Sequence, residues 1–275
     1  MWRDHPGLRR TVVSHPADRD VLAAVRSLIE RERFGARVTV VVGDAVGVTA
    51  AVDLDDGVIA GSLPPDVETG HVLADVASLV ERELPATVEY GAVEIFIEPV
   101  TPAPRLVIFG AVHIAQALSD HASLLGYHVT VSDSRPIFTT PERFPHADAL
   151  LVGWPDQVAD RLVLDRRTSV VVLSHDARFE DPLWPIVLPT PVRYIGAMGS
   201  KRTAQARRER LAEAGFGPEA IDRIHGPVGM NIGADSPGEV AVAILAEMIS
   251  ALRRPGVPLP LMGERAPLRR GEAPG

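Results

Sequence analysis

The sequence predicts an α/β protein with a C-terminal, Rossmann-like, doubly wound parallel sheet and a smaller N-terminal α+β domain. From residue 105 onward, strand-length apolar runs alternate with helix-length segments, a pattern typical of parallel strands joined by right-handed crossovers. The runs 106–109 and 169–173 are almost wholly apolar, as expected for strands buried on both faces. Three prolines within residues 99–104 indicate an extended linker.

These features divide the chain into four predicted parts. The N-terminal domain covers residues 1–98, the linker 99–104 and the Rossmann-like domain 105–252. Residues 253–275 are rich in Pro, Gly and Arg without periodicity, so we expect a disordered tail there.

The N-terminal elements follow from hydrophobic periodicity. Apolar residues at helical spacing predict helices over 18–33 and 67–84. β-rich runs predict strands over 37–42, 46–54 and 58–60, the last two joined by a hairpin turn at Asp55-Asp56-Gly57. Alternation of apolar and polar residues predicts one half-buried strand over 87–97.

The C-terminal elements alternate along the chain. The predicted strands are 105–109, 127–132, 149–152, 168–174 and 192–197. The predicted helices are about 112–125, 155–164, 180–187 and 200–214. A capping box at Ser236-Pro-Gly-Glu239 begins a last helix that runs to about residue 252.

Composition narrows the functional classes. The chain has 275 residues, 46% of them hydrophobic, and a formal net charge of −8, which argues against nonspecific binding to nucleic acid. No apolar run is long enough to span a membrane, and the first residues lack the apolar core of a secretory signal, so we expect a cytoplasmic protein. Because there is no cysteine, disulfides, thiolate metal sites and thiol nucleophiles are excluded.

The first candidate site is a glycine turn after the strand 105–109. The nucleotide-binding pattern Gly-x-Gly-x-x-Gly/Ala appears here as Gly110-Ala111-Val112-His113, followed by Ala115. Val112 replaces the glycine that normally lets the backbone touch a pyrophosphate, whereas His113 lies on the first helical turn, near any ligand. The turn is therefore either an anion-binding site or a purely structural strand-helix connection.

The second candidate is Asp133, which ends the next strand. An acid at this place typically accepts hydrogen bonds from a ribose diol and repels a 2′-phosphate, which favours an NAD, FAD or adenosine ligand. The alternative is that Asp133 pairs with its neighbour Arg135.

The third candidate is Ser174-His175-Asp176, directly after an apolar strand. A His-Asp pair there is suited to proton transfer, metal ligation or hydrogen bonding to a ligand. The alternative is that Asp176 only fixes the loop.

The fourth candidate is a glycine turn before a basic helix. Gly196 and Gly199 precede Ser200, a predicted N-cap, and the cations Lys201 and Arg202, an arrangement that favours phosphate or carboxylate binding. The alternative is a solvated charged helix face. A further glycine-rich loop, 225–236, is expected to close over the same crevice.

Taken together, these segments resemble the xanthine dehydrogenase accessory (XdhC/CoxI) family over nearly all of residues 105–252. The matching segments are Leu106-Val-Ile-Phe-Gly-Ala-Val-His113, Asp133-Ser-Arg-Pro136, Pro141-Glu-Arg-Phe-Pro145, Ser174-His-Asp176, Tyr194-Ile-Gly-Ala-Met-Gly-Ser-Lys-Arg-Thr203 and His225-Gly-Pro-Val-Gly-Met-Asn-Ile-Gly-Ala-Asp-Ser-Pro237. There are two departures. Val112 stands in place of the family's second glycine, and the stretch 61–68 lacks the cysteine of the family's Gly-Gly-Cys-Val-Glu element.

The resemblance implies a role in the maturation of molybdenum hydroxylases. Such a protein holds a molybdopterin-type cofactor as cargo while its terminal sulfur is installed, and then passes it to the xanthine dehydrogenase-type apoenzyme, without turnover of its own. A cysteine desulfurase and a second copy of the chain are further candidate partners; nucleic acid and membranes are not expected. The competing interpretations are an NAD- or FAD-dependent oxidoreductase on the same fold, and a ligand-free scaffold that binds a dehydrogenase.

Overall fold

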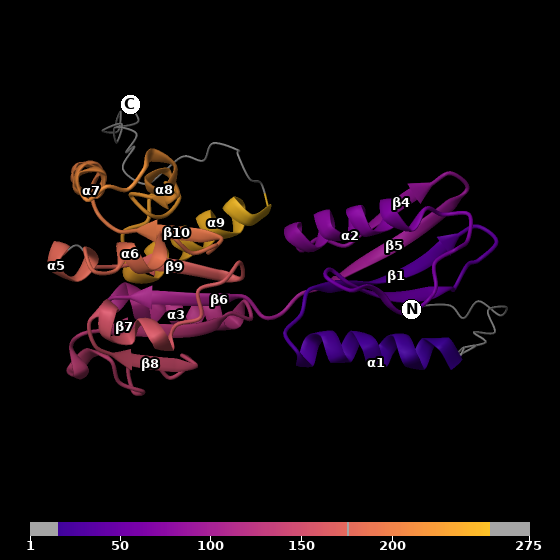
Figure 1. The fold of residues 1–275 in the computed structure, drawn as a ribbon. Helices are drawn as coiled ribbons and strands as arrows, with labels where there is room; N and C mark the ends of the chain where they lie inside the picture. Colours follow the sequence, from indigo (N-terminus) through magenta and orange to yellow (C-terminus); the bar gives the residue numbers. More distant parts are fainter. Residues whose placement is uncertain (1–15, 175, 254–275) are drawn as a thin grey trace, which may run out of the picture. The chain divides into compact units, whose positions relative to one another are not determined.

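The chain consists of two units, each with its own hydrophobic core. The computed structural model describes residues 16–174 and 176–253, and the chain divides between Pro102 and Ala103 (Figure 1). The predicted disordered tail falls, beyond Arg253, outside the described residues. In the described part of the chain, every helix is too short or too polar to cross a membrane.

The N-terminal unit is an antiparallel sheet between two helices. Its elements are α1 (Pro16–Glu30), β1 (Gly35–Val42), β2 (Thr49–Asp53), β3 (Gly57–Gly61), α2 (Thr69–Arg82), β4 (Ala86–Tyr90) and β5 (Val93–Val100). The strand order is β3-β2-β1-β5-β4. The helix α2 buries Val72, Val76 and Val80 against one face, and α1 covers the other (Figure 1).

The predicted single strand over 87–97 is wrong, because this stretch is a hairpin. The strands β4 and β5 pair antiparallel, with Tyr90 opposite Val93. Gly91 connects them with a φ of +66°, a conformation that glycine adopts at little steric cost. The apolar positions change from even numbers, ending at Tyr90, to odd numbers, beginning at Val93, so the alternation itself breaks at the turn.

The C-terminal unit is a six-stranded sheet in which all the strands are parallel, which confirms the predicted fold class. Its strand order is β11-β10-β9-β6-β7-β8. The strands are β6 (Arg105–Phe109), β7 (His128–Asp133), β8 (Ala149–Val152), β9 (Thr168–Val172), β10 (Tyr194–Ala197) and β11 (Ile224–His225). Numbered from β6, this is the order 3-2-1-4-5-6 of dinucleotide-binding folds, which reverses direction between β6 and β9.

Helices cover both faces of this sheet. They are α3 (His113–Leu124), α4 (Pro155–Val158), α5 (Ala177–Glu180), α6 (Trp184–Val187), α7 (Lys201–Glu213), α8 (Pro218–Asp222) and α9 (Pro237–Arg253). Because side chains alternate along a strand, Leu106 and Ile108 pack with residues of α3 and α9, whereas Val107 and Phe109 pack with residues of α5, α6 and α7.

Two predicted helices are shorter than expected. The predicted helix 155–164 is α4 followed by a 3-10 turn, Ala159–Arg161, and at Leu162 the backbone becomes extended. The predicted helix 180–187 is divided into α5 and α6, because Pro182 and Pro185 lack the amide hydrogens that a continuous helix needs. The two shortest elements, α8 and β11, were not predicted.

Candidate functional site

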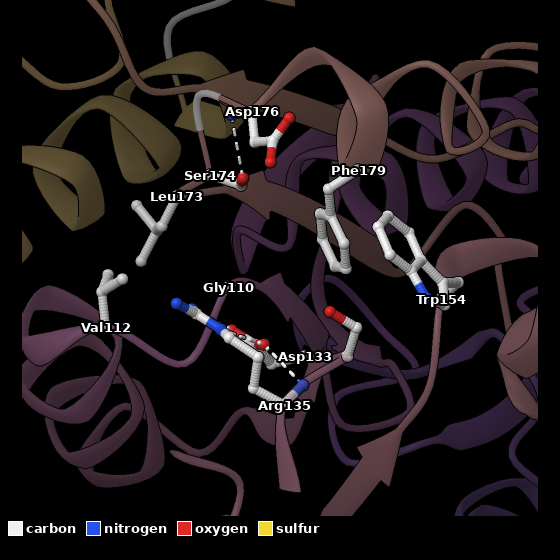
Figure 2. Close-up of a pocket in the computed structure, with 10 residues that line it drawn as sticks. Gly110, Val112, Asp133, Arg135, Trp154, Leu173, Ser174, Asp176 and Phe179 are labelled. Carbon is white, nitrogen blue, oxygen red and sulfur yellow. Dashed lines mark hydrogen bonds and ion pairs between the residues drawn. The ribbon is translucent and has the colours of Figure 1, made fainter. Parts of the chain in front are cut away.

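A cavity lies at the carboxyl ends of β6, β7 and β9, at the point where the strand order reverses (Figure 2). Open α/β sheets bind ligands at this point because the loops from two adjacent strands diverge there. The cavity is lined by Gly110, Val112, Asp133, Ser134, Arg135, Trp154, Leu173, Ser174, Asp176 and Phe179. Most of these residues follow a strand directly, so the sheet itself positions them.

The glycine turn is shaped by the closeness of two strands. Gly110 has a φ of +107°, and a Cβ there would lie 3.1 Å from the backbone nitrogen of Ser174, so only glycine fits without strain. Ala111 is buried. Val112 is the N-cap residue of α3 and lines the cavity, whereas His113 is exposed and lies outside the cavity lining.

Asp133 is held by four hydrogen bonds from the protein. Its Oδ2 accepts from the backbone N–H of Ala111 (2.8 Å) and from Nη2 of Arg135 (2.8 Å). Its Oδ1 accepts from the backbone N–H and from Nε of Arg135, both at 2.9 Å. The structure therefore shows the pairing with Arg135 that the sequence offered as the alternative to ribose binding.

This environment keeps Asp133 ionised. The carboxylate side chain is 3% exposed, and this burial alone would raise its pKa. The hydrogen bonds from Arg135 and Ala111, together with the positive charge of Arg135, outweigh burial and lower the pKa of Asp133 below its ordinary value. The pKa of Arg135 is raised, chiefly by its hydrogen bond to Asp133.

The loop after β9 is fixed by Asp176. Asp176 is the N-cap residue of α5: its carboxylate accepts from the backbone N–H of Arg178 at 3.0 Å and forms an ion pair with that side chain. The backbone N–H of Asp176 donates to Oγ of Ser174 at 3.2 Å. Ser174 and Asp176 both line the cavity, and the predicted candidate His175 lies outside the described residues.

Two aromatic side chains form a wall of the cavity that sequence reasoning missed. The ring centroids of Trp154 and Phe179 lie 5.8 Å apart at an interplanar angle of 46°, and Figure 2 shows both rings on the side opposite Val112. Trp154 is 38% exposed although it is a large aromatic residue. The sequence hint was a tryptophan directly after a strand of the parallel sheet.

The second glycine turn lies at the same edge of the sheet but outside the cavity lining. β10 pairs parallel with β9, so both carboxyl ends reach this edge. Ser200 caps α7 as predicted, because its Oγ accepts from the backbone N–H of Thr203 at 3.1 Å. Lys201 and Arg202 are exposed on the first turn of α7.

Below this turn lies a buried ion pair. Arg207 donates from Nε and Nη2 to the two carboxylate oxygens of Glu180 at 2.9 and 2.8 Å, and both side chains are at most 2% exposed. Nη2 of Arg207 also donates to the carbonyl oxygen of Met198 at 2.8 Å. Arg207 therefore joins α7 to α5 and to the glycine turn, and does not belong to a solvated charged face.

The glycine-rich loop 225–236 is anchored to α9 by Glu247. The fully buried carboxylate accepts from Tyr194 Oη (2.8 Å) and from the backbone N–H of Gly229 (2.6 Å), and contacts Nδ1 of His225 at 3.1 Å. Burial would raise the pKa of Glu247, but these three contacts outweigh it and lower the pKa. The predicted closure of this loop over the crevice is not observed, because its residues are absent from the cavity lining.

Gly196 is explained by the same network. A Cβ at Gly196 would lie 2.5 Å from Val228 and 2.8 Å from Tyr194 Oη, so the glycine provides room for packing. Among the sequence-predicted residues, the structure thus brings Gly110, Val112, Asp133, Ser174 and Asp176 around one cavity. It places His113, Lys201 and Arg202 outside the lining.

Comparison with known proteins supports a common evolutionary origin. The chain is 32% identical over 162 residues to a Bacillus subtilis protein named as one of the probable subunits of xanthine dehydrogenase, and the match covers 59% of this chain and 47% of that protein. It is 29% identical over 149 residues to the molybdenum cofactor insertion chaperone PaoD of Escherichia coli, covering 54% and 40% respectively. The match thus spans less than half of the length of either relative.

A solved structure shows the same fold. A Bacillus halodurans protein described as a xanthine dehydrogenase superposes with a TM-score of 0.64, at 23% identity, over 87% of this chain and 66% of that one. The XdhC Rossmann domain family matches residues 106–248, which is more than half of the chain and contains every strand of the parallel sheet except the first residue of β6. This chain therefore belongs to the XdhC family.

Proposed function

We propose that this chain is an accessory protein in the maturation of a xanthine dehydrogenase-type molybdenum enzyme. In this role it holds a molybdopterin-type cofactor as cargo, without turnover of its own. The observation that carries the proposal is the cavity at the strand-order reversal, in a chain whose relatives include a protein named as a molybdenum cofactor insertion chaperone.

The cavity has the chemistry for such a cargo. Trp154 and Phe179 offer aromatic surface for a planar pterin ring, since aromatic rings favour stacked or tilted contacts with other rings. Arg135 and Ser174, on other sides of the cavity, offer hydrogen-bond donors for the polar end of the ligand (Figure 2).

The same residues argue against a dinucleotide. Val112 brings a branched side chain to the place where a pyrophosphate needs bare backbone, and it packs against the core beside the cavity. Asp133, the residue that would bind a ribose diol, already accepts four hydrogen bonds from the protein. These two features favour the accessory role over the NAD- or FAD-dependent oxidoreductase.

The partners follow from the proposed role. The recipient of the cargo is a xanthine dehydrogenase-type apoenzyme. Because the sequence has no cysteine, the terminal sulfur of the cofactor must come from another protein, for which a cysteine desulfurase has the right chemistry. Lys201 and Arg202 are proposed as additional anion contacts at the same sheet edge, and a homodimer is proposed as the assembled state.

Cofactor retention tests the proposal. The chain is purified from cells that make the cofactor, and bound molybdenum is measured by mass spectrometry and bound pterin by fluorescence. We expect both in the unaltered chain and neither in Val112→Trp, whose indole fills the cavity. Val242→Trp, on an exposed position of α9, is the matched control and should retain both.

A thermal-stability series separates the alternatives. A ligand at 100 times its dissociation constant adds about 2.7 kcal/mol to the free energy of unfolding, so binding is visible as a higher melting temperature. We expect stabilisation by the isolated cofactor and none by NAD or FAD. Stabilisation by NAD alone would reverse the proposal in favour of an oxidoreductase.

A further inference from the structure

We propose that Arg135 prevents Asp133 from binding a ribose diol and turns this side of the cavity into a binding site for a phosphate monoester. The inference rests on the proposed function, because the expected cargo carries a phosphate at its polar end. It assigns that phosphate to Arg135, within the cavity, and not to Lys201 and Arg202, which lie outside its lining.

The first step is that Asp133 has no acceptor capacity left for a ligand. A carboxylate offers about four lone-pair sites, and Asp133 accepts four hydrogen bonds from Ala111 and Arg135 at 2.8 to 2.9 Å. With its side chain only 3% exposed, the carboxylate is also shielded from a ligand in the cavity. A ribose diol could bind here only after Arg135 had left.

The second step is that Arg135 presents only donors to the cavity. Its Nε and Nη2 bind Asp133, whereas Nη1 has no hydrogen-bond partner among residues 16–174 and 176–253. The side chain is 54% exposed and lines the cavity, and Figure 2 shows the guanidinium lying across Asp133 with its end directed toward the space between Val112 and Leu173. A guanidinium donates and never accepts, so it suits phosphoryl oxygens and not a diol.

The third step is that the guanidinium is held in place before a ligand arrives. Its two bonds to Asp133 fix the plane of the fork, and its carbon Cζ lies 4.5 Å from the ring centroid of Phe138. Such preorganisation reduces the entropy cost of binding an oxyanion. Ser174, across the cavity, supplies a hydroxyl on a second wall.

The same local pairing elsewhere in the chain provides a control. Arg178 binds Asp176 through its backbone N–H, Nε and Nη2, in the same i, i+2 pattern as Arg135 and Asp133. Its side chain is 83% exposed and lies outside the cavity lining. Loss of Arg178 removes one surface cation and one Asp-x-Arg pair but leaves the cavity wall intact.

The test is a titration of the full chain with three probes: phenyl phosphate, inorganic phosphate and adenosine. We expect phenyl phosphate to bind, inorganic phosphate to bind more weakly because it cannot contact the aromatic wall, and adenosine not to bind. In Arg135→Gln the affinity for phenyl phosphate should fall about tenfold or more, because a charge-assisted hydrogen bond is lost. Arg178→Gln should bind as the unaltered chain does.

Four results would overturn the inference. They are no binding of phenyl phosphate to the unaltered chain, undiminished binding in Arg135→Gln, adenosine binding as tight as that of phenyl phosphate, and inorganic phosphate binding as tight as that of the monoester. If Arg135→Gln does not fold, Arg135→Lys is used: it keeps the charge but loses the planar fork, and its affinity should fall measurably relative to Arg178→Lys.

The two proposals fail separately. Molybdenum and pterin retained by the chain, together with phenyl phosphate binding that ignores Arg135, would refute the phosphate assignment alone. Phenyl phosphate binding that depends on Arg135, in a chain that never retains molybdenum or pterin, would refute the proposed cargo alone.

Discussion

Glu247 is a buried carboxylate that binds three parts of the C-terminal unit to α9. Tyr194 belongs to β10, His225 to β11 and Gly229 to the loop that follows, and all three contact the same two oxygen atoms. A buried charge of this kind is stable only while its partners satisfy it. The phenol also responds, because burial and the negative charge of Glu247 raise the pKa of Tyr194 well above its ordinary value.

Glu247→Gln should destabilise the protein at neutral pH by about 2 kcal/mol or more, since hydrogen bonds to a charged acceptor are lost. The pKa of Glu247 is lowered on folding, so its ionisation stabilises the folded state above the ordinary glutamate pKa of about 4.3. That contribution disappears as the pH falls through the lowered folded-state pKa. The difference in free energy of unfolding between the two proteins, measured in urea, should therefore shrink from pH 7 toward pH 3.

The exposed Glu213→Gln is the control for this measurement and should show little difference at either pH. A difference between Glu247→Gln and the unaltered chain that stays constant with pH would show that packing, and not ionisation, accounts for the role of Glu247.

Residue pairs near in sequence were open to prediction, and distant ones were not. Asp133 and Arg135 are two positions apart, and the same Asp-x-Arg pairing recurs at Asp165 and Arg167, so the contact is local. Glu180 and Arg207 are separated by 27 positions, and nothing in the basic run of α7 distinguishes the buried arginine from its exposed neighbours. Only the packing of α7 on α5 reveals it.

At the scale of elements, the glycine turn of the β4–β5 hairpin is a sharp test of the corrected fold. Gly91→Ala should destabilise the protein by about 1 kcal/mol, because alanine is strained at a φ of +66° although nothing lies within 4 Å of its Cβ. The same change at Gly238, inside α9 and equally unobstructed, should stabilise it by about 0.5 to 1 kcal/mol.

Urea unfolding of both alanine variants measures this contrast. Opposite signs support the hairpin, whereas a neutral Gly91→Ala would return residues 87–97 to a continuous strand.

Strong periodicity made the longer elements predictable, and local breaks in pattern explain the errors. The prolines at positions 182 and 185 and the change of parity after Tyr90 were visible in the sequence, and both mark places where a predicted element was too long. By contrast, β11 has only two residues, and its membership of the sheet depends on pairing with Ile195 and Gly196, which no local pattern encodes.

At the scale of the whole molecule, two separate cores imply two unfolding events. One core contains the residues of α2 and the antiparallel sheet, and the others lie on the two faces of the parallel sheet. We expect calorimetry to show two transitions. Gly91→Ala should lower the temperature of one and Glu247→Gln that of the other; a single transition shifted by both variants would contradict independent folding.

The edge that carries the cavity was predictable from the whole chain, but its membership was not. Parallel strands bring their carboxyl ends to one edge, so Gly110, Asp133 and Ser174 were expected to lie near one another. Which loops reach the space between β6 and β9 depends on three-dimensional packing. Trp154 and Phe179 enter it and Lys201 does not.

The anchoring of the glycine-rich loop by α9 has a practical meaning for protein engineering. A shortened version of the chain that stops before position 247 would leave Tyr194 and the amide of Gly229 inside the protein with no acceptor. The minimal unit that can be expressed for binding studies must therefore retain α9, although no part of that helix touches the cavity.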